Sequence, residues 1–200
     1  MARKEVSVWH SEGNGVILSI TSEGNFLMAD AKSIKGSFER QAKAVGLRPS
    51  IGRRTVVSKA RVVDGLKCEI EEGPWKLTAD LAKEGGGEDQ GPTPGVLGRG
   101  ALGACLAMGY VLWASKFEVP ISNLEVEVHT DVDERGRFGF HDEISPGYQR
   151  VRYIVRIEST APDADIMRVL DMADRHSPYL DNFARALDIS REVRIAARKS

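Results

Sequence analysis

Two cysteines and one serine are the side chains of this sequence that are best suited to covalent chemistry. Cys105 shares a helical face with apolar and small residues, namely Ala101, Leu102, Met108, Gly109 and Leu112. That spacing favours a small buried side chain. The alternative is a redox thiol, which needs a partner that stabilises the thiolate and a route for the oxidant. Cys68 alternates with Leu66 and Ile70 on a predicted strand, where core packing is the favoured role.

Ser177 stands between His176 and Pro178, and this order predicts a helix N-cap followed by proline at the first helical position. No G-x-S-x-G motif supports a nucleophilic serine, so hydrolysis by Ser177 with His176 has little basis. The four histidines form no i, i+4 pair and have no C-x-x-C neighbour, so we expect no metal site and no cofactor. They are His10, His129, His141 and His176.

A long helix is predicted from Pro94 to about Val119-Pro120, with Thr93 as its N-cap. No residue between Arg99 and Lys116 is charged. A helix that is apolar on every side either spans a membrane or forms the buried centre of a fold. The uncharged segment is shorter than the roughly 20 residues of a span, so we predict a central buried helix. Its many glycines indicate the close approach of another backbone, which predicts a homodimer.

The glycine-rich segment 85–91 precedes this helix, as phosphate-binding loops do. It lacks the G-K-[ST] of a P-loop and the spacing of a dinucleotide fingerprint, so it is weak evidence for either site.

Short strands and turns around these features predict an α+β fold. Residues 1–52 form an N-terminal extension with short strands or a hairpin and an amphipathic helix over 33–45. Residues 53–200 form the main domain. It begins with antiparallel strands in 55–63, 66–70 and 75–79, with a hairpin turn at Asp64-Gly65. Two amphipathic strands (124–128 and 151–157), two helices after Pro162 and Ser177, and a closing strand over 189–195 follow the central helix.

The composition excludes several partners. Lys and Arg total 28 against 29 for Asp and Glu, and a net charge of −1 offers no field that would attract nucleic acid or an anionic membrane. The basic N-terminus has no apolar segment behind it, so a secretory signal is not expected. Two cysteines make no disulfide framework, which indicates the reducing cytoplasm.

The segment GGGEDQGPTP, followed by a small-residue helix that reads ALGACLAMG with a lone cysteine, resembles the OsmC/Ohr family of organic hydroperoxide reductases. The resemblance covers about Thr55 to Ala197 and includes the later strand pair and the two helices. It implies an α+β homodimer of intertwined chains, with long central helices and sites at the subunit interface.

The resemblance also implies roles for individual residues. Cys105 occupies the place of the peroxidatic cysteine, and Ser177 stands where active members have the resolving cysteine of a Cys-Pro step. Gly95 stands where a glutamate usually follows the loop proline. The family's arginine comes from the early hairpin, where this chain offers Lys67 or the nearby Arg61.

The sequence therefore predicts an OsmC-like, peroxiredoxin-like redox protein of the stress response. Cys105 would reduce a small hydroperoxide, and an external thiol would take the part of the missing resolving cysteine. The alternative is a catalytically degenerate dimer that binds a small apolar ligand in the interface pocket.

Overall fold

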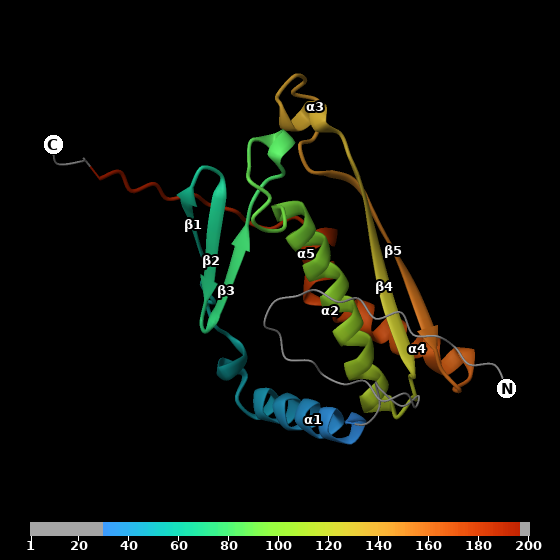
Figure 1. Cartoon of the computed structure of the whole chain (residues 1–200). Coiled ribbons are helices and arrows are strands. Elements are labelled where there is room, and N and C mark those ends of the chain that lie inside the picture. Colours follow the sequence, from blue (N-terminus) through green and yellow to red (C-terminus); the bar gives the residue numbers. More distant parts are fainter. Residues whose placement is uncertain (1–29, 197–200) are drawn as a thin grey trace, which may run out of the picture.

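The computed structural model describes residues 30–196 of the 200-residue chain, and it is a mixed α+β structure around one long helix, as the sequence predicts (Figure 1). The strands and hairpin predicted within the first 28 residues lie outside the described part. In chain order the elements are α1 (Ala31–Leu47), η1 (Pro49–Gly52), β1 (Lys59–Asp64), β2 (Lys67–Glu72), β3 (Trp75–Ala79), η2 (Lys83–Gly85), α2 (Pro94–Phe117), β4 (Asn123–Val132), α3 (Glu134–Arg137), β5 (Tyr148–Glu158), α4 (Asp163–Arg175) and α5 (Pro178–Ala184).

Helix α2 begins and ends where its sequence signals predict. The Thr93 hydroxyl accepts a hydrogen bond from the Val96 N–H, and Pro94 stands at the first helical position. The helix ends where Glu118 takes a left-handed φ of 60°. It is the one helix of the described part that is long and apolar enough to cross a membrane. However, it packs against α1, β4, α4 and α5, which are the contacts of a core helix.

One side of α2 forms the hydrophobic core. Four of its buried side chains are spaced three or four residues apart, as one helical face requires: Leu102, Leu106, Tyr110 and Ala114. They meet Val169 and Ala173 of α4 and the inner face of the β4–β5 pair. The backbone of α2 lies close to β4 at Gly103, where even a Cβ would reach van der Waals contact with Val128, at 3.4 Å.

The opposite side of α2 is exposed in the single chain. A stripe of uncharged residues at four-residue spacing faces outward, and we call it the α2 stripe: Val96, Gly100, Ala104, Met108 and Leu112. Met108 is 62% exposed, and nothing lies within 4 Å of the position that a Cβ on Gly100 would take.

Strands β4 and β5 form the antiparallel pair that the alternating sequence predicts. Leu124, Val126 and Val128 of β4 face the core. The outer face carries ion pairs across the strands, such as the two hydrogen bonds of 2.7 and 3.1 Å from Arg152 to Asp131. The amphipathic pair therefore covers α2 with one face and presents charge with the other.

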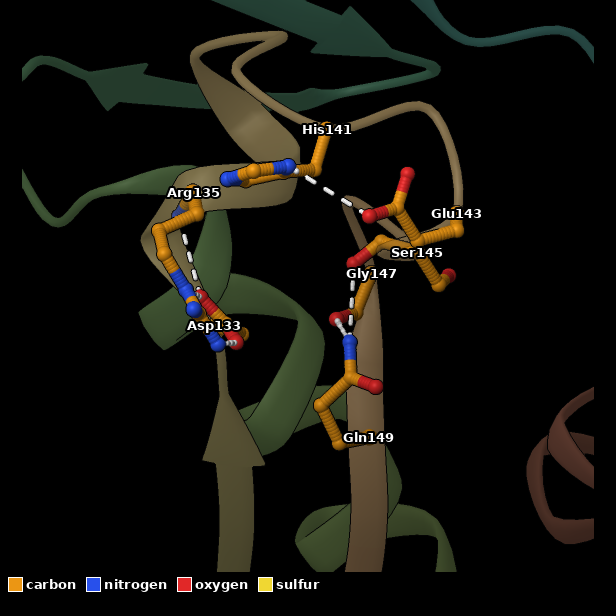
Figure 2. Close-up of polar contacts among 7 residues, drawn as sticks. All are labelled: Asp133, Arg135, His141, Glu143, Ser145, Gly147 and Gln149. Carbon is orange, nitrogen blue, oxygen red and sulfur yellow. Dashed lines mark hydrogen bonds and ion pairs between the residues drawn. The ribbon is translucent and has the colours of Figure 1, made fainter.

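The connection between β4 and β5 contains α3 and is held by its own polar contacts (Figure 2). The Asp133 carboxylate accepts hydrogen bonds from the Arg135 guanidinium, and the Gln149 side-chain amide donates to the carbonyl oxygens of Ser145 and Gly147. These contacts join residues of the connection to one another, so they add no group to the site described below.

Strands β1, β2 and β3 form a separate meander in that order. The predicted turn at Asp64-Gly65 is present, with Gly65 at φ 50°. Register places the apolar side chains on one face, namely Ala60, Val62, Cys68, Ile70, Trp75, Leu77 and Ala79. No helix covers this face within the described chain, and Trp75 is 72% exposed.

Helix α1 begins two residues before the predicted amphipathic segment and ends two residues after it. It crosses the C-terminal half of α2, where the ring of Phe38 lies 5.4 Å from that of Trp113, edge to face. Lys116 Nζ lies 4.2 Å from the centre of the Trp113 ring and completes the contact as a cation–π pair.

The closing strand predicted over 189–195 is wrong for the described chain. These residues form no strand, and Ile189 is 91% exposed. The alternation of apolar and polar residues is present, but a strand also needs a neighbouring strand for its hydrogen bonds, and the single chain offers none here.

The glycine-rich loop before α2 is organised around the buried carboxylate of Asp80. This side chain accepts hydrogen bonds from the backbone N–H groups of Gln90, Glu88 and Leu81 at 3.1, 3.0 and 2.8 Å. These donors, above all the Gln90 N–H, hold the pKa of the Asp80 carboxylate below its ordinary value. Gly87 is required because a Cβ there would lie 2.0 Å from the Leu81 carbonyl oxygen.

We expect Asp80→Asn to lower Tm at pH 7 by roughly 5 °C, because an amide offers a single acceptor oxygen to three backbone donors. The pKa of Asp80 is lower in the folded state, so its carboxylate stabilises the fold above the unfolded pKa of about 3.9. That stabilisation is lost as the pH falls through the folded-state pKa. The Tm difference between wild type and variant should therefore shrink in acid.

Thermal unfolding between about pH 7 and pH 3 measures this difference. Glu88→Gln is the matched control, since it neutralises an exposed carboxylate of the same loop and leaves the backbone N–H of residue 88 in place. A difference for Asp80→Asn that stays constant with pH would contradict the assignment.

Candidate active site

Cys105 and Ser177 are brought together by the fold although they lie 72 residues apart. The Cys105 Sγ and the Ser177 Oγ are separated by 3.5 Å, within hydrogen-bond distance for sulfur. Cys105 is half-buried on α2, and Ser177 is buried at the junction of α4 and α5. Within the described residues, the Ser177 hydroxyl is the only polar group recorded in contact with the Cys105 thiol.

Ser177 caps α5, as its sequence context predicts. Its Oγ accepts a hydrogen bond of 3.3 Å from the Leu180 N–H. A hydroxyl that accepts one hydrogen bond still has its own proton to donate. The geometry therefore allows Ser177 to donate that proton to the Cys105 sulfur.

A half-buried carboxylate at the end of α4 fixes this corner. The Asp174 carboxylate accepts hydrogen bonds of 2.7 Å from the hydroxyls of Tyr110 on α2 and Tyr153 on β5. Burial, followed by the bond to Asp174, raises the pKa of Tyr153 to about 12 and that of the fully buried Tyr110 further. We call these three residues the Tyr–Asp–Tyr network.

Sequence reasoning missed this network. Two signals were available, because buried tyrosines need hydrogen-bond partners, and Tyr110 and Tyr153 fall on a central helix and on the inner face of a strand. The sequence gives no sign that one carboxylate serves both hydroxyls.

The two basic candidates lie on the meander, and within the described residues neither has a polar contact with Cys105. Arg61 Nη2 lies 3.2 Å from Glu69 Oε2 on the charged face of the sheet. Lys67 borders the hollow that also contains Asp80 and Glu88. In the single chain, Arg61 and Lys67 are therefore not part of the site formed by Cys105 and Ser177.

The remaining candidates are also separate from this pair. Cys68 is half-buried on the apolar face of the meander, and the described residues contain no cluster of three His, Cys, Asp or Glu side chains that could hold a metal ion. The glycine-rich loop directs two of its N–H groups, those of Glu88 and Gln90, at Asp80, so these donors are not free for a phosphate.

Comparison with known proteins gives the class of the chain. The family model for OsmC-like proteins matches residues 86–192, which is just over half of the sequence. The chain therefore belongs to the OsmC-like family. The matched residues include α2 with Cys105 and the corner with Ser177. A comparison with curated protein sequences found no match.

Solved structures share the fold. An OsmC-like protein of Mycoplasma pneumoniae has a TM-score of 0.56 at 16% identity, over 65% of this chain and 87% of that one. An osmotic stress induced and detoxification response protein of Psychrobacter arcticus has a TM-score of 0.52 at 13% identity, over 65% and 89%. An organic hydroperoxide resistance protein of Elizabethkingia anophelis has a TM-score of 0.50 at 14% identity, over 66% and 89%.

The distance between Cys105 and Ser177 predicts that a thiol at position 177 will bridge to Cys105. We expect Ser177→Cys to form this disulfide under mild oxidation, because the two side-chain atoms already lie 3.5 Å apart. A weakened N-cap should cost about 1 kcal/mol of stability. Peptide mapping under non-reducing conditions detects the bridge.

Ser115→Cys is the matched control, since Ser115 is a buried serine of α2 that lies about 15 Å from Cys105 along the helix axis. This variant should form no bridge to Cys105. Free thiols in folded, oxidised Ser177→Cys protein would mean that residue 177 does not adjoin Cys105 in solution.

Proposed function

We propose that this protein is a thiol-dependent reductase of organic hydroperoxides that uses Cys105 as its redox residue. The observation that carries the proposal is the contact between the Cys105 thiol and the Ser177 hydroxyl on an OsmC-like scaffold. The names of the Elizabethkingia anophelis structure and of other solved relatives support the same class of substrate. Family membership alone does not assign the activity, so the proposal depends on the site.

The reaction would proceed in balanced steps. The Cys105 thiol first loses its proton to solvent, and its thiolate then attacks the terminal oxygen of a hydroperoxide ROOH. The O–O bond breaks, the leaving alkoxide takes up a proton from solvent, and the products are the sulfenic acid of Cys105 and the alcohol ROH. An external thiol then attacks the sulfenic sulfur, which releases water and leaves a mixed disulfide. A second external thiol restores Cys105 and leaves as a disulfide of the reductant.

Ser177 would act in this sequence through its hydroxyl. A hydroxyl donor at 3.5 Å stabilises negative charge on the Cys105 sulfur, and Ser177 stays oriented because the Leu180 N–H holds its oxygen. Serine has no thiol, so the Cys105 sulfenic acid would stay open to an external thiol. This property distinguishes the proposed cycle from one that closes an internal disulfide.

The exposed apolar surfaces of the single chain support a homodimer as the active form. The α2 stripe carries no charged side chain, and the apolar face of the meander carries one, Glu72 at its edge. Both surfaces are open in the single chain. Small residues at Gly100 and Ala104 leave room for a second helix to approach α2 closely. A second copy of this chain would cover both surfaces, and it could bring Arg61 or Lys67 towards Cys105.

A second function is supported by one hollow. Ile34, Ala107, Met108, Val111, Leu112 and Leu124 line an apolar depression between α1, α2 and β4. A dimer without peroxidase activity could bind a small apolar ligand there. This alternative would be favoured if the wild-type protein consumed no hydroperoxide with any thiol. It would also have to bind a long-chain alcohol with a stoichiometry of one ligand per chain.

We expect wild-type protein to consume an alkyl hydroperoxide in the presence of a small thiol, and Cys105→Ser to reduce this rate at least 100-fold because the nucleophile is removed. Cys68→Ser is the matched control and should keep most of the activity. The assay follows hydroperoxide loss with several mono- and dithiols. Equal rates for wild type and Cys105→Ser would exclude the proposed cycle.

Light scattering should give a mass of twice 21.9 kDa for the wild-type protein at micromolar concentration. Met108→Glu should shift the mass towards 21.9 kDa, because it places a charge in the α2 stripe. Met167→Glu is the control, since Met167 is similarly exposed (53%) but lies on α4, away from the stripe. A wild-type monomer, or equal effects of the two changes, would count against this dimer.

A further inference from the structure

The Tyr–Asp–Tyr network and the Cys105–Ser177 pair share one corner of the fold. Asp174 lies three residues before Ser177, in the last turn of α4. Its backbone carbonyl oxygen accepts a hydrogen bond of 3.2 Å from the Ser177 N–H. One residue therefore joins the network through its side chain and the Ser177 backbone through its main chain.

The two tyrosines connect this corner to the elements on either side. Tyr110 lies five residues after Cys105 on the same helix, which is about 7.5 Å along its axis. Tyr153 lies on β5 opposite Val128 of β4, in the strand pair that covers α2. Both hydroxyls lie 2.7 Å from a carboxylate oxygen of Asp174, one on each oxygen.

We propose that Asp174 is a positioning residue for the redox site: it holds the α4–α5 corner against α2 so that Ser177 Oγ stays within reach of Cys105 Sγ. The purpose of this positioning rests on the proposed function. The position of Ser177 Oγ relative to Cys105 Sγ is independent of any peroxidase activity. Without the network, the corner would be held by packing contacts such as that of Ala173 with Gly109. Such contacts fix the distance of the corner from α2 but not its orientation.

The chemistry of the network suits this role. Hydrogen bonds to a carboxylate are shorter and stronger than bonds between neutral groups, and here each oxygen of Asp174 accepts one from a different element. Burial and the nearby carboxylate raise the pKa values of both tyrosines, so both hydroxyls stay protonated and keep donating at neutral pH. Both tyrosines therefore remain hydrogen-bond donors across the physiological pH range.

The network is also separate from the other supports of the corner. His176 stacks on Trp113 with ring centres 5.3 Å apart, and Ser177 caps α5 through the Leu180 N–H. Neither contact involves a tyrosine hydroxyl. Removing one hydroxyl thus leaves the cap and the stack intact and changes only the support that Asp174 gives.

The test measures the equilibrium between the Cys105–177 disulfide and the two free thiols in full-length Ser177→Cys protein, using reduced and oxidised glutathione. Tyr153→Phe and Tyr110→Phe are added singly to this background. We expect each to lower the effective concentration of the two thiols about tenfold, which is about 30 mV for a two-electron couple. Thermal unfolding identifies the variants that are folded.

Tyr179→Phe is the matched control, because Tyr179 lies on α5 beside the corner and its hydroxyl has no recorded hydrogen bond within the described residues. It should leave the effective concentration unchanged within about twofold. The rate at which Cys68 reacts with a thiol reagent reports general loosening of the chain, and it should stay constant. If Tyr110→Phe does not fold, Tyr153→Phe decides alone.

An unchanged effective concentration of the two thiols in folded Tyr153→Phe protein would overturn the proposal. A lower effective concentration that is accompanied by faster reaction of Cys68 with the thiol reagent would also overturn it. Neither result depends on hydroperoxide. If wild-type protein consumes no hydroperoxide but Tyr153→Phe weakens the bridge, the proposed function fails and the positioning role of Asp174 stands.

Discussion

The uncharged, small-residue helix α2 is the constraint on which the rest of the structure depends. It passes through the centre of the fold without a charged side chain between Arg99 and Lys116, so every part of its surface is stabilised by being covered. In the single chain, α1, β4, α4 and α5 cover one side only. The α2 stripe and the apolar face of the meander both remain open.

Two carboxylates that each accept several hydrogen bonds set the geometry of this framework. The buried carboxylate of Asp80 accepts from three backbone N–H groups and thereby fixes the glycine-rich loop that leads into α2. The half-buried carboxylate of Asp174 accepts from two tyrosine hydroxyls beside the corner that carries Ser177. An acceptor withdrawn from water is costly to leave unsatisfied, so the donors around each carboxylate restrict the local backbone path.

The Cys105–Ser177 pair has a chemical consequence for the proposed cycle. A serine at this position can orient and stabilise a neighbouring sulfur, but it cannot form a disulfide with it. The resemblance puts Gly95 where a glutamate is expected, and Arg61 and Lys67 lie on the meander outside the Cys105–Ser177 pair. The single chain therefore offers only a minimal site. In the proposed dimer, the partner's meander is the element that could complete the site, because no helix of the described residues covers the apolar face of the meander.

The sequence by itself determined the elements whose signals are local. Thr93-Pro94 and Ser177-Pro178 start helices because hydroxyl caps and proline act within one turn, and Asp64-Gly65 makes a hairpin because glycine tolerates a positive φ. Only the tertiary structure decided which distant groups meet: the thiol of Cys105 with Ser177, and two tyrosines with Asp174. The predicted closing strand was wrong for a related reason. Alternation is local, but strand pairing requires a neighbour that a sequence pattern does not supply.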